Sequence, residues 1–138
     1  MNKTLITFFT VLFCLTSSVG WSLEYKDLVY RDGLYYKKFT EVPFTGEITG
    51  KKTGSLRNGK QDGSWTSYHT NGQLDSKGNY KNGMVVGSFI SYHDNGQLMT
   101  KGEFKNGKSD GSWVGYKQDG TLWKEFTGTF KNGKRIAD

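Results

Sequence analysis

The stretch Gly63-Ser-Trp-Thr-Ser-Tyr-His-Thr-Asn-Gly-Gln-Leu74 decides the fold, because the chain repeats it twice. The copies are Gly87-Ser-Phe-Ile-Ser-Tyr-His-Asp-Asn-Gly-Gln-Leu98 and Gly111-Ser-Trp-Val-Gly-Tyr-Lys-Gln-Asp-Gly-Thr-Leu122, so the period is 24 residues. A shorter phrase that ends in Asn-Gly also recurs, and it begins at Gly54, Gly78, Gly102 and Gly128. A period of this size indicates a repeat array, in which each unit buries its apolar side chains against its neighbours.

Turn-forming dipeptides punctuate the repeats. Asn-Gly occurs at 58–59, 71–72, 82–83, 95–96, 106–107 and 132–133, and Asp-Gly at 119–120. These dipeptides tolerate the positive φ that a two-residue type I′ hairpin turn needs at both central positions. The intervening segments are rich in aromatic and β-branched residues and show no helical spacing of apolar residues. We therefore expect an all-β fold, a single-layer antiparallel meander of repeated β-hairpins over residues 54–138.

Two-residue turns also predict which residues oppose each other across a hairpin. Counting outward from Asn71-Gly72 gives these pairs: Thr70 with Gln73, His69 with Leu74, Tyr68 with Asp75, Trp65 with Gly78 and Gly63 with Tyr80. The next unit gives Phe89 with Gly102 and Gly87 with Phe104. Each large aromatic side chain of these units is therefore expected to face a glycine and to cover its bare backbone.

Alternation of side chains along the strands sorts the repeats into two faces. The expected structural core is an apolar face that carries Trp65, Phe89, Trp113, Leu74, Leu98, Leu122, Tyr80, Phe104 and Phe130, with Gly63, Gly78, Gly87, Gly102, Gly111 and Gly128 among them. The insertion at Glu125-Phe126-Thr127 adds two residues, an even number, so Phe126 is expected on the same face. The opposite face is the candidate partner-binding surface, with Tyr68, Tyr92, Tyr116, Lys77, Lys81, Lys101 and Lys105.

Residues 1–22 have the pattern of a signal peptide. Lys3 precedes the apolar run Leu5–Leu15, and small residues follow at 17–20. The run has about half of the ~20 residues that a membrane-spanning helix needs, so we expect cleavage rather than retention as an anchor. Phe13 stands where a lipoprotein would need a small residue before Cys14. The protein is therefore expected to be exported, either to the periplasm or out of the cell.

Residues 23–53 are expected to form a degenerate N-terminal capping repeat. The dipeptide Asp32-Gly33 lies between two apolar segments and predicts a hairpin, and residues 44–50 predict a further strand. Terminal repeats are usually atypical because one of their sides faces water.

The two recurring phrases resemble the MORN repeat (membrane occupation and recognition nexus), in the bacterial variant found in exported proteins and in antitoxin-like components of toxin–antitoxin modules. The resemblance covers residues 54–134 closely and 28–50 loosely. It departs at Lys117, where the other units have His, at Val85-Val86, and at the two-residue insertion. It implies a twisted single-layer sheet with a binding or scaffolding role, and it implies no catalytic residues.

The repeated polar residues have structural explanations. His69 and His93 occupy equivalent positions, but Lys117 fills the third, and neither cysteines nor clustered carboxylates complete a metal ligand set. Asp62 and Asp110 belong to units two repeats apart, whereas a catalytic carboxylate pair must converge in one pocket. We therefore expect no catalytic, metal or cofactor site.

The tyrosine and lysine face is the main functional candidate. A stripe of rings flanked by cations fits an acidic partner protein, anionic headgroups or a glycan chain, whereas tyrosines that only pack across strands would need no ligand. The formal net charge of +6 is a mild bias, and no nucleic-acid partner is expected. The apolar face must be covered by curling of the sheet, by the N-terminal segment, or by a second molecule, which includes self-association. We expect a non-enzymatic protein–protein interaction module of an antitoxin- or immunity-like kind, with anionic membrane lipids or envelope glycans as the alternative ligands.

Overall fold

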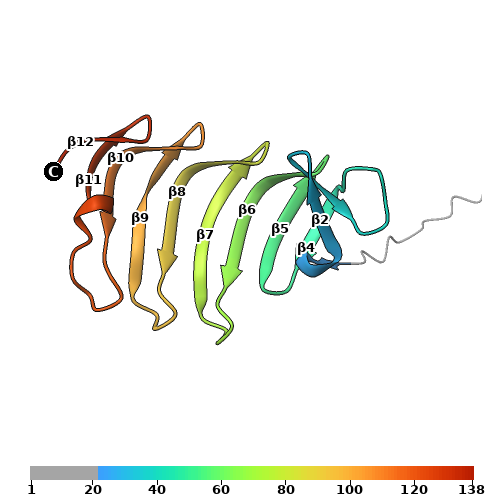
Figure 1. Cartoon of the computed structure of the whole chain (residues 1–138), viewed down its shortest axis with the longest axis horizontal. Helices are drawn as coiled ribbons and strands as arrows, with labels where there is room; N and C mark the ends of the chain where they lie inside the picture. Colours follow the sequence, from blue (N-terminus) through green and yellow to red (C-terminus); the bar gives the residue numbers. More distant parts are fainter. Residues whose placement is uncertain (1–21) are drawn as a thin grey trace, which may run out of the picture.

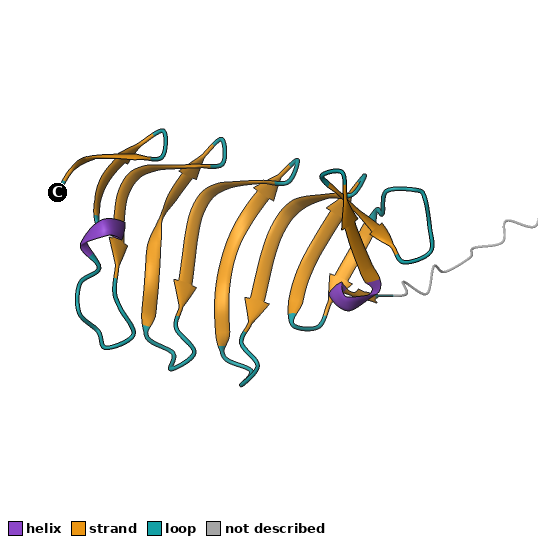
Figure 2. Cartoon of the chain, viewed as in Figure 1, coloured by secondary structure: helices purple, strands orange, loops and turns teal. Residues whose placement is uncertain are grey.

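The computed structural model describes residues 22–138, so the expected signal peptide lies outside the described residues. Figure 1 shows hairpins placed side by side along the long axis of the molecule. Figure 2 shows that nearly all of the described chain is strand or turn. No helix between residues 22 and 138 has the length and apolar character needed to cross a bilayer.

The strands are short and follow one another closely. They are β1 (Leu23–Glu24), β2 (Leu28–Arg31), β3 (Leu34–Lys37), β4 (Gly46–Thr49), β5 (Lys52–Arg57), β6 (Lys60–Tyr68), β7 (Leu74–Lys81), β8 (Met84–Tyr92), β9 (Leu98–Lys105), β10 (Lys108–Gly115), β11 (Gly128–Lys131) and β12 (Lys134–Ala137). Two 3-10 turns, η1 (Tyr25–Asp27) and η2 (Lys124–Phe126), complete the elements.

Ten strands form one sheet in the order β1-β4-β5-β6-β7-β8-β9-β10-β11-β12, and β2 and β3 form a separate two-stranded sheet. Neighbours from β4 to β12 are antiparallel, whereas β1 pairs with β4 in parallel. The predicted all-β meander of hairpins is therefore confirmed.

One end of the meander has the predicted type I′ turns. Asn58, Asn82, Asn106 and Asn132 have φ between 49° and 51°, and the glycines that follow them have φ between 74° and 79°. The turn glycines also connect neighbouring hairpins: the amide of Gly83 donates to the carbonyl of Gln61 at 2.8 Å, and that of Gly133 donates to the carbonyl of Ser109 at 2.8 Å. This edge of the sheet is thus bonded across repeats as well as within them.

At the other end the predicted two-residue turns are wrong. Gly72 has a φ of 84° but Asn71 does not share the positive φ. The Gly72 amide donates to the His69 carbonyl at 3.0 Å, and the His69 amide donates to the Gln73 carbonyl at 2.8 Å. Thr70, Asn71 and Gly72 therefore form a three-residue loop, a type I turn followed by a left-handed glycine. The side-chain oxygen of Asn71 accepts a hydrogen bond from the Gln73 amide at 3.0 Å, which favours this loop.

A bulge in β7 compensates for the odd number of loop residues. Tyr68 opposes Leu74, whereas the preceding residue Ser67 opposes Ser76, so Asp75 is an extra residue in its strand. The same step occurs in the next hairpin, where Met99 is the extra residue. Because an odd loop and a one-residue bulge together restore the parity, side chains beyond the bulge keep the predicted face.

The predicted pairing of Trp65 with Gly78 is therefore confirmed, although the turn that predicted it has a different length. Leu74 lies between the loop and the bulge and shares the face of Tyr68, opposite to that of Trp65. Its expected place in the apolar core is wrong, and the same correction applies to Leu98 and Leu122.

The large rings of the apolar face lie over glycines, but over those of the preceding strand. The ring of Trp65 fills the space that a Cβ at Gly54 would need, and the ring of Trp113 does the same at Gly102. The expectation that Trp65 covers Gly78 is thus corrected, since the ring of Phe89 covers that glycine. Each indole also donates its Nε1–H to a backbone carbonyl. Trp65 bonds Ser55 at 3.1 Å, and Trp113 bonds Glu103 at 3.0 Å.

The N-terminal segment covers one end of the apolar face. Leu28 of β2 is buried with Ile48, Leu56 and Trp65 of the sheet. Leu23, Tyr25, Tyr35, Phe44 and Tyr80 pack around this core. The predicted hairpin at Asp32-Gly33 is confirmed, but it folds onto the array as a separate sheet instead of extending it (Figure 1). The expected covering by the N-terminal segment is confirmed, and it reaches only the first strands, while covering by a second molecule stays a prediction.

Candidate binding surfaces

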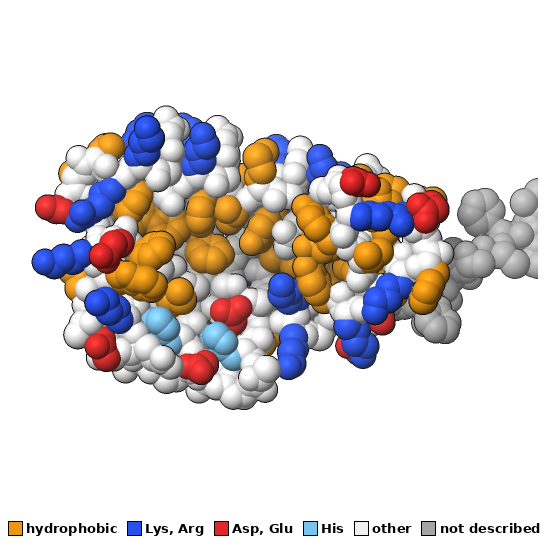
Figure 3. All heavy atoms as spheres, viewed as in Figure 1, with side chains coloured by type: hydrophobic (Ala, Val, Ile, Leu, Met, Phe, Trp, Pro, Cys, Tyr) orange, Lys and Arg blue, Asp and Glu red, His pale blue; other side chains and the backbone are white. Residues whose placement is uncertain are grey.

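Beyond this cap the apolar face is open. It holds a cavity of about 480 Å³ whose lining includes the aromatic side chains of Phe89, Phe104, Trp113, Phe126 and Phe130, and we call it the aromatic groove. Figure 3 views this face and shows apolar side chains gathered along its centre. The ring of Phe104 meets that of Trp113 edge-on, with centroids 4.9 Å apart, and that of Phe89 at 5.5 Å. These contacts fix the orientation of the rings in the groove.

Polar groups form one border of the aromatic groove. The buried hydroxyls of Ser91 and Thr100 share a hydrogen bond of 2.7 Å. The charged side chains in the lining are Asp75 and Glu125, both acidic, although the chain as a whole has a formal charge of +6. The electrostatic character of this groove is therefore opposite to that of the protein.

The predicted tyrosines lie on the opposite face, where each opposes a leucine. The pairs are Tyr68 with Leu74, Tyr92 with Leu98 and Tyr116 with Leu122. Tyr68 is 42% exposed and Leu122 is 47% exposed, while the others are partly covered. We call this line the tyrosine–leucine row. Directly opposed side chains such as these are close enough to pack against each other across the strands.

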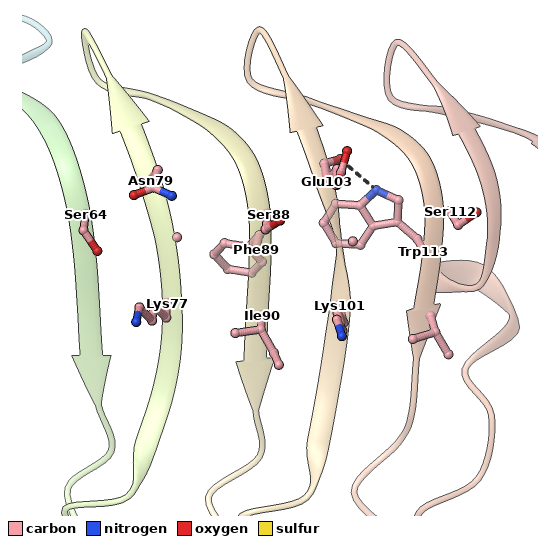
Figure 4. A pocket seen from close by; sticks show the side chains of 13 residues that line it. Ser64, Lys77, Asn79, Ser88, Phe89, Ile90, Lys101, Glu103, Ser112 and Trp113 are labelled. Carbon is pink, nitrogen blue, oxygen red and sulfur yellow. Dashed lines mark hydrogen bonds between the residues drawn. The ribbon is translucent and has the colours of Figure 1, made fainter.

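A second groove of about 700 Å³ lies on this same face, and we call it the lysine groove. Figure 4 shows it from the side opposite to Figure 1, with β6 to β10 running from left to right. Of the predicted lysines, Lys77 and Lys101 line it, with Ile90 between them, while Lys81 and Lys105 lie outside the lining, next to the type I′ turns. A parallel row contributes Ser64, Asn79, Ser88, Glu103 and Ser112.

The two histidines connect neighbouring repeats. The Nε2 atom of His69 lies 2.9 Å from the Tyr92 carbonyl, and that of His93 lies 2.8 Å from the Tyr116 carbonyl. Since a carbonyl can only accept, each Nε2 carries the proton and donates. Within residues 22–138 no group of three or more His, Cys, Asp or Glu is placed to hold a metal ion. The histidines thus have a structural role between repeats, which the sequence alone did not reveal.

The displaced pKa values belong to groups outside both grooves. Burial, together with the hydrogen bond between the Tyr35 and Tyr25 hydroxyls, raises the pKa of Tyr35 to about 12. Burial also raises the pKa of Tyr80. The hydroxyl of Thr121 donates to the Asp119 carboxylate and lowers the pKa of that group. The shifts therefore follow from packing and turn geometry.

Residues 61–82 and 85–106 match the family model of the MORN repeat variant. The first segment spans most of β6 and all of β7, and the second spans most of β8 and all of β9, so each match is one hairpin of the sheet. These two hairpins are therefore similar to the MORN repeat variant, and MORN repeats are generally protein- or lipid-binding modules. Neither a curated protein nor a solved structure matches the chain.

Proposed function

We propose that the protein is a non-enzymatic binding module whose aromatic groove holds an apolar segment of a partner protein. The observation that carries the proposal is the uncapped cavity of about 480 Å³ that five aromatic side chains line: Phe126 is exposed, Phe89, Phe104 and Phe130 are partly buried, and Trp113 is buried. Clefts lined mainly by apolar and aromatic side chains, with a few polar groups, are the usual form of a binding site.

The covered end of the same face indicates what fits there. Leu28 of β2 and Tyr35 of β3 pack on the sheet around Trp65. In the open units Phe89 and Trp113 take the position of Trp65, so the surface that holds the hairpin is repeated without a cover. A strand or hairpin that presents leucine and tyrosine side chains therefore fits the aromatic groove.

The charges in the lining refine the chemistry of this partner. Asp75 and Glu125 favour a segment that also carries Lys or Arg. The signal-peptide pattern supports a partner met after export, in the periplasm or outside the cell. The resemblance to antitoxin-like MORN proteins supports a toxin as that partner and an immunity-like role. The proposal includes no cofactor and no nucleic acid.

A peptide with the sequence of residues 23–38 is a suitable probe, because it contains the hairpin that covers the first units. We expect it to bind the purified protein, and we expect Phe126→Glu and Phe104→Glu to weaken binding at least tenfold. Val42→Glu is the matched control, since Val42 is 74% exposed and lies outside the groove. Circular dichroism verifies that each variant is folded, and sedimentation velocity measures self-association. Equal peptide binding by wild type and both groove variants would rule out the proposal.

Anionic membrane lipids are a second candidate ligand, favoured by the exposed Lys77 and Lys101 on the opposite face. A lysine close to an anionic bilayer contributes about 1 kcal/mol to binding. Sedimentation with vesicles of phosphatidylglycerol, at low and high salt, tests this candidate. Failure to pellet with these vesicles at low salt excludes it.

A further inference from the structure

We propose that the lysine groove binds an extended β-1,4-linked glycan that carries one carboxylate per disaccharide. The site lies on the face opposite to the aromatic groove, so the inference does not depend on the proposed partner protein. A glycan chain is one of the ligand classes expected for the tyrosine and lysine face. The inference assigns it to one groove and gives the repeat length of the glycan.

The spacing of the repeats carries the argument. Each repeat contributes two strands, and neighbouring strands lie about 4.8 Å apart, so equivalent side chains recur about every 10 Å across the sheet. Lys77 and Lys101 are equivalent residues of successive repeats, and both line the groove. Two sugar rings of an extended β-1,4-linked chain advance by about the same distance as one repeat. A glycan that crosses the strands therefore meets one lysine per disaccharide.

The side chains on the floor of the groove suit such a chain. The cross-strand pairing places Lys77, Ile90, Lys101 and Val114 in one line, which Figure 4 shows in part. The partly buried Ile90 and Val114 offer apolar surface to the faces of sugar rings, while the exposed ammonium groups reach carboxylates. The adjacent row of serines, with Asn79, supplies hydroxyl and amide groups for hydrogen bonds to sugar hydroxyls.

The length of the groove sets the length of the ligand. Its lining extends from Ser64 on β6 to Ser112 on β10, which is four steps between strands, or about 19 Å. Four sugar rings, that is two disaccharides, fill this length. Glu103 is the single carboxylate in the lining, at the position that Asn79 holds in the preceding repeat, and it opposes an anionic ligand.

The experiment compares three probes by isothermal titration calorimetry. They are peptide-free strands of alternating N-acetylglucosamine and N-acetylmuramic acid, chitin oligosaccharides with the same linkage but no carboxylate, and polyglutamate. We expect the first probe to bind best, with an affinity that rises from disaccharide to tetrasaccharide and then levels off.

The variants assign this binding to the groove. Lys77→Gln and Lys101→Gln should each weaken it about two- to fivefold, as for partly exposed charge pairs, and Glu103→Asn should strengthen it by a similar factor. Lys134→Gln is the control, because Lys134 is an exposed lysine on β12 outside the groove, and it should have no effect.

Equal affinity for chitin, equal affinity for polyglutamate, or unchanged binding by the double variant Lys77→Gln/Lys101→Gln would overturn the inference. The two proposals fail separately. Phe126→Glu should keep the glycan affinity, and Lys77→Gln/Lys101→Gln should keep the affinity for the hairpin peptide.

Discussion

Replacing Gly102 with alanine tests whether the repeats depend on close contact between rings and glycines. The φ of Gly102 lies outside the left-handed region, so alanine meets no backbone penalty there. The ring of Trp113, however, occupies the space of the new Cβ. This ring is only 8% exposed, and its Nε1–H donates to the Glu103 carbonyl at 3.0 Å. The substitution must therefore displace a buried and hydrogen-bonded side chain.

The expected loss of stability follows from these contacts. Overpacking at a buried position costs about 1–3 kcal/mol, and the indole hydrogen bond contributes about 1 kcal/mol. We therefore expect Gly102→Ala to lower the free energy of unfolding by about 2–4 kcal/mol. In a chain of this size the midpoint of thermal unfolding should fall by about 10 °C.

Urea and thermal unfolding followed by circular dichroism measure the effect, with Gly111→Ala as the matched comparison. Gly111 has a φ of 84° and nothing within 4 Å of its Cβ position, so alanine there meets only backbone strain, about 1–2 kcal/mol. Trp113→Ala removes the obstacle, so Gly102→Ala should cost little in that background. Two results would contradict this reasoning. Either Gly102→Ala lowers the free energy of unfolding by less than about 1 kcal/mol, or its effect and that of Trp113→Ala are fully additive in the double variant.

Three further predictions concern the aromatic ring of the second repeat, a link between repeats and the cap. Phe89→Trp should raise the free energy of unfolding by about 1 kcal/mol, because an indole there can donate to the Asn79 carbonyl as the other two units do; a lower urea midpoint would contradict this. His93→Ala removes the donor to the Tyr116 carbonyl and should cost about 1 kcal/mol in the same assay, so an unchanged midpoint would argue against the link. Burial raises the pKa of Tyr35 from 10 to about 12, so its contribution to stability is complete below pH 10 and is lost as the pH rises through 12. Between pH 10 and 12 the stability of Tyr35→Phe should fall less steeply than that of the wild type, and equal slopes in urea unfolding would refute the assignment.

The sequence predicted the meander because both kinds of evidence for it are local. Period-2 alternation and Asn-Gly dipeptides act within one hairpin, and the structure has strands and turns where they occur. The type of turn was predictable only at one end. At Asn58 both turn residues adopt positive φ, whereas at Asn71 only the following glycine does, although the dipeptide is the same. Asn-Gly suits either turn, so the flanking bulge and hydrogen bonds decide between them.

The facing of the leucines was predicted wrongly, because counting outward from a two-residue turn placed Leu74 opposite His69 and so on the face of Trp65, whereas it opposes Tyr68. Both possible registers pair Trp65 with Gly78, so the clearest pattern in the sequence is insensitive to the bulge at Asp75. Only the residues between loop and bulge change face. A leucine that pairs with a tyrosine can be partly covered on either face of a single-layer sheet. Its apolar character therefore does not predict on which face of the sheet it lies.

The candidate surfaces show a similar division. The lysines at 77 and 101 were identified from the alternation, and the structure places both in one groove. The serines at 64, 88 and 112 recur with the same period and were overlooked, because small polar residues in strands have no evident role until a groove is seen. The extent of the cap could not be predicted, since residues 23–49 do not follow the 24-residue pattern and their contacts are specific to the tertiary fold.

The packing of aromatic rings on glycines also limits which residues can change to alter binding specificity without loss of stability. Trp113 lines the aromatic groove and packs on Gly102, so a change of specificity at this residue would weaken the sheet itself. Phe126 lies in η2 outside the repeated strands and is 43% exposed, so its side chain can change with less effect on folding. Binding should therefore be more sensitive than stability to substitution at Phe126, and the reverse should hold at Trp113. A repeat protein of this kind can diversify its ligand through insertions and exposed rows while the ring and glycine rows keep the register.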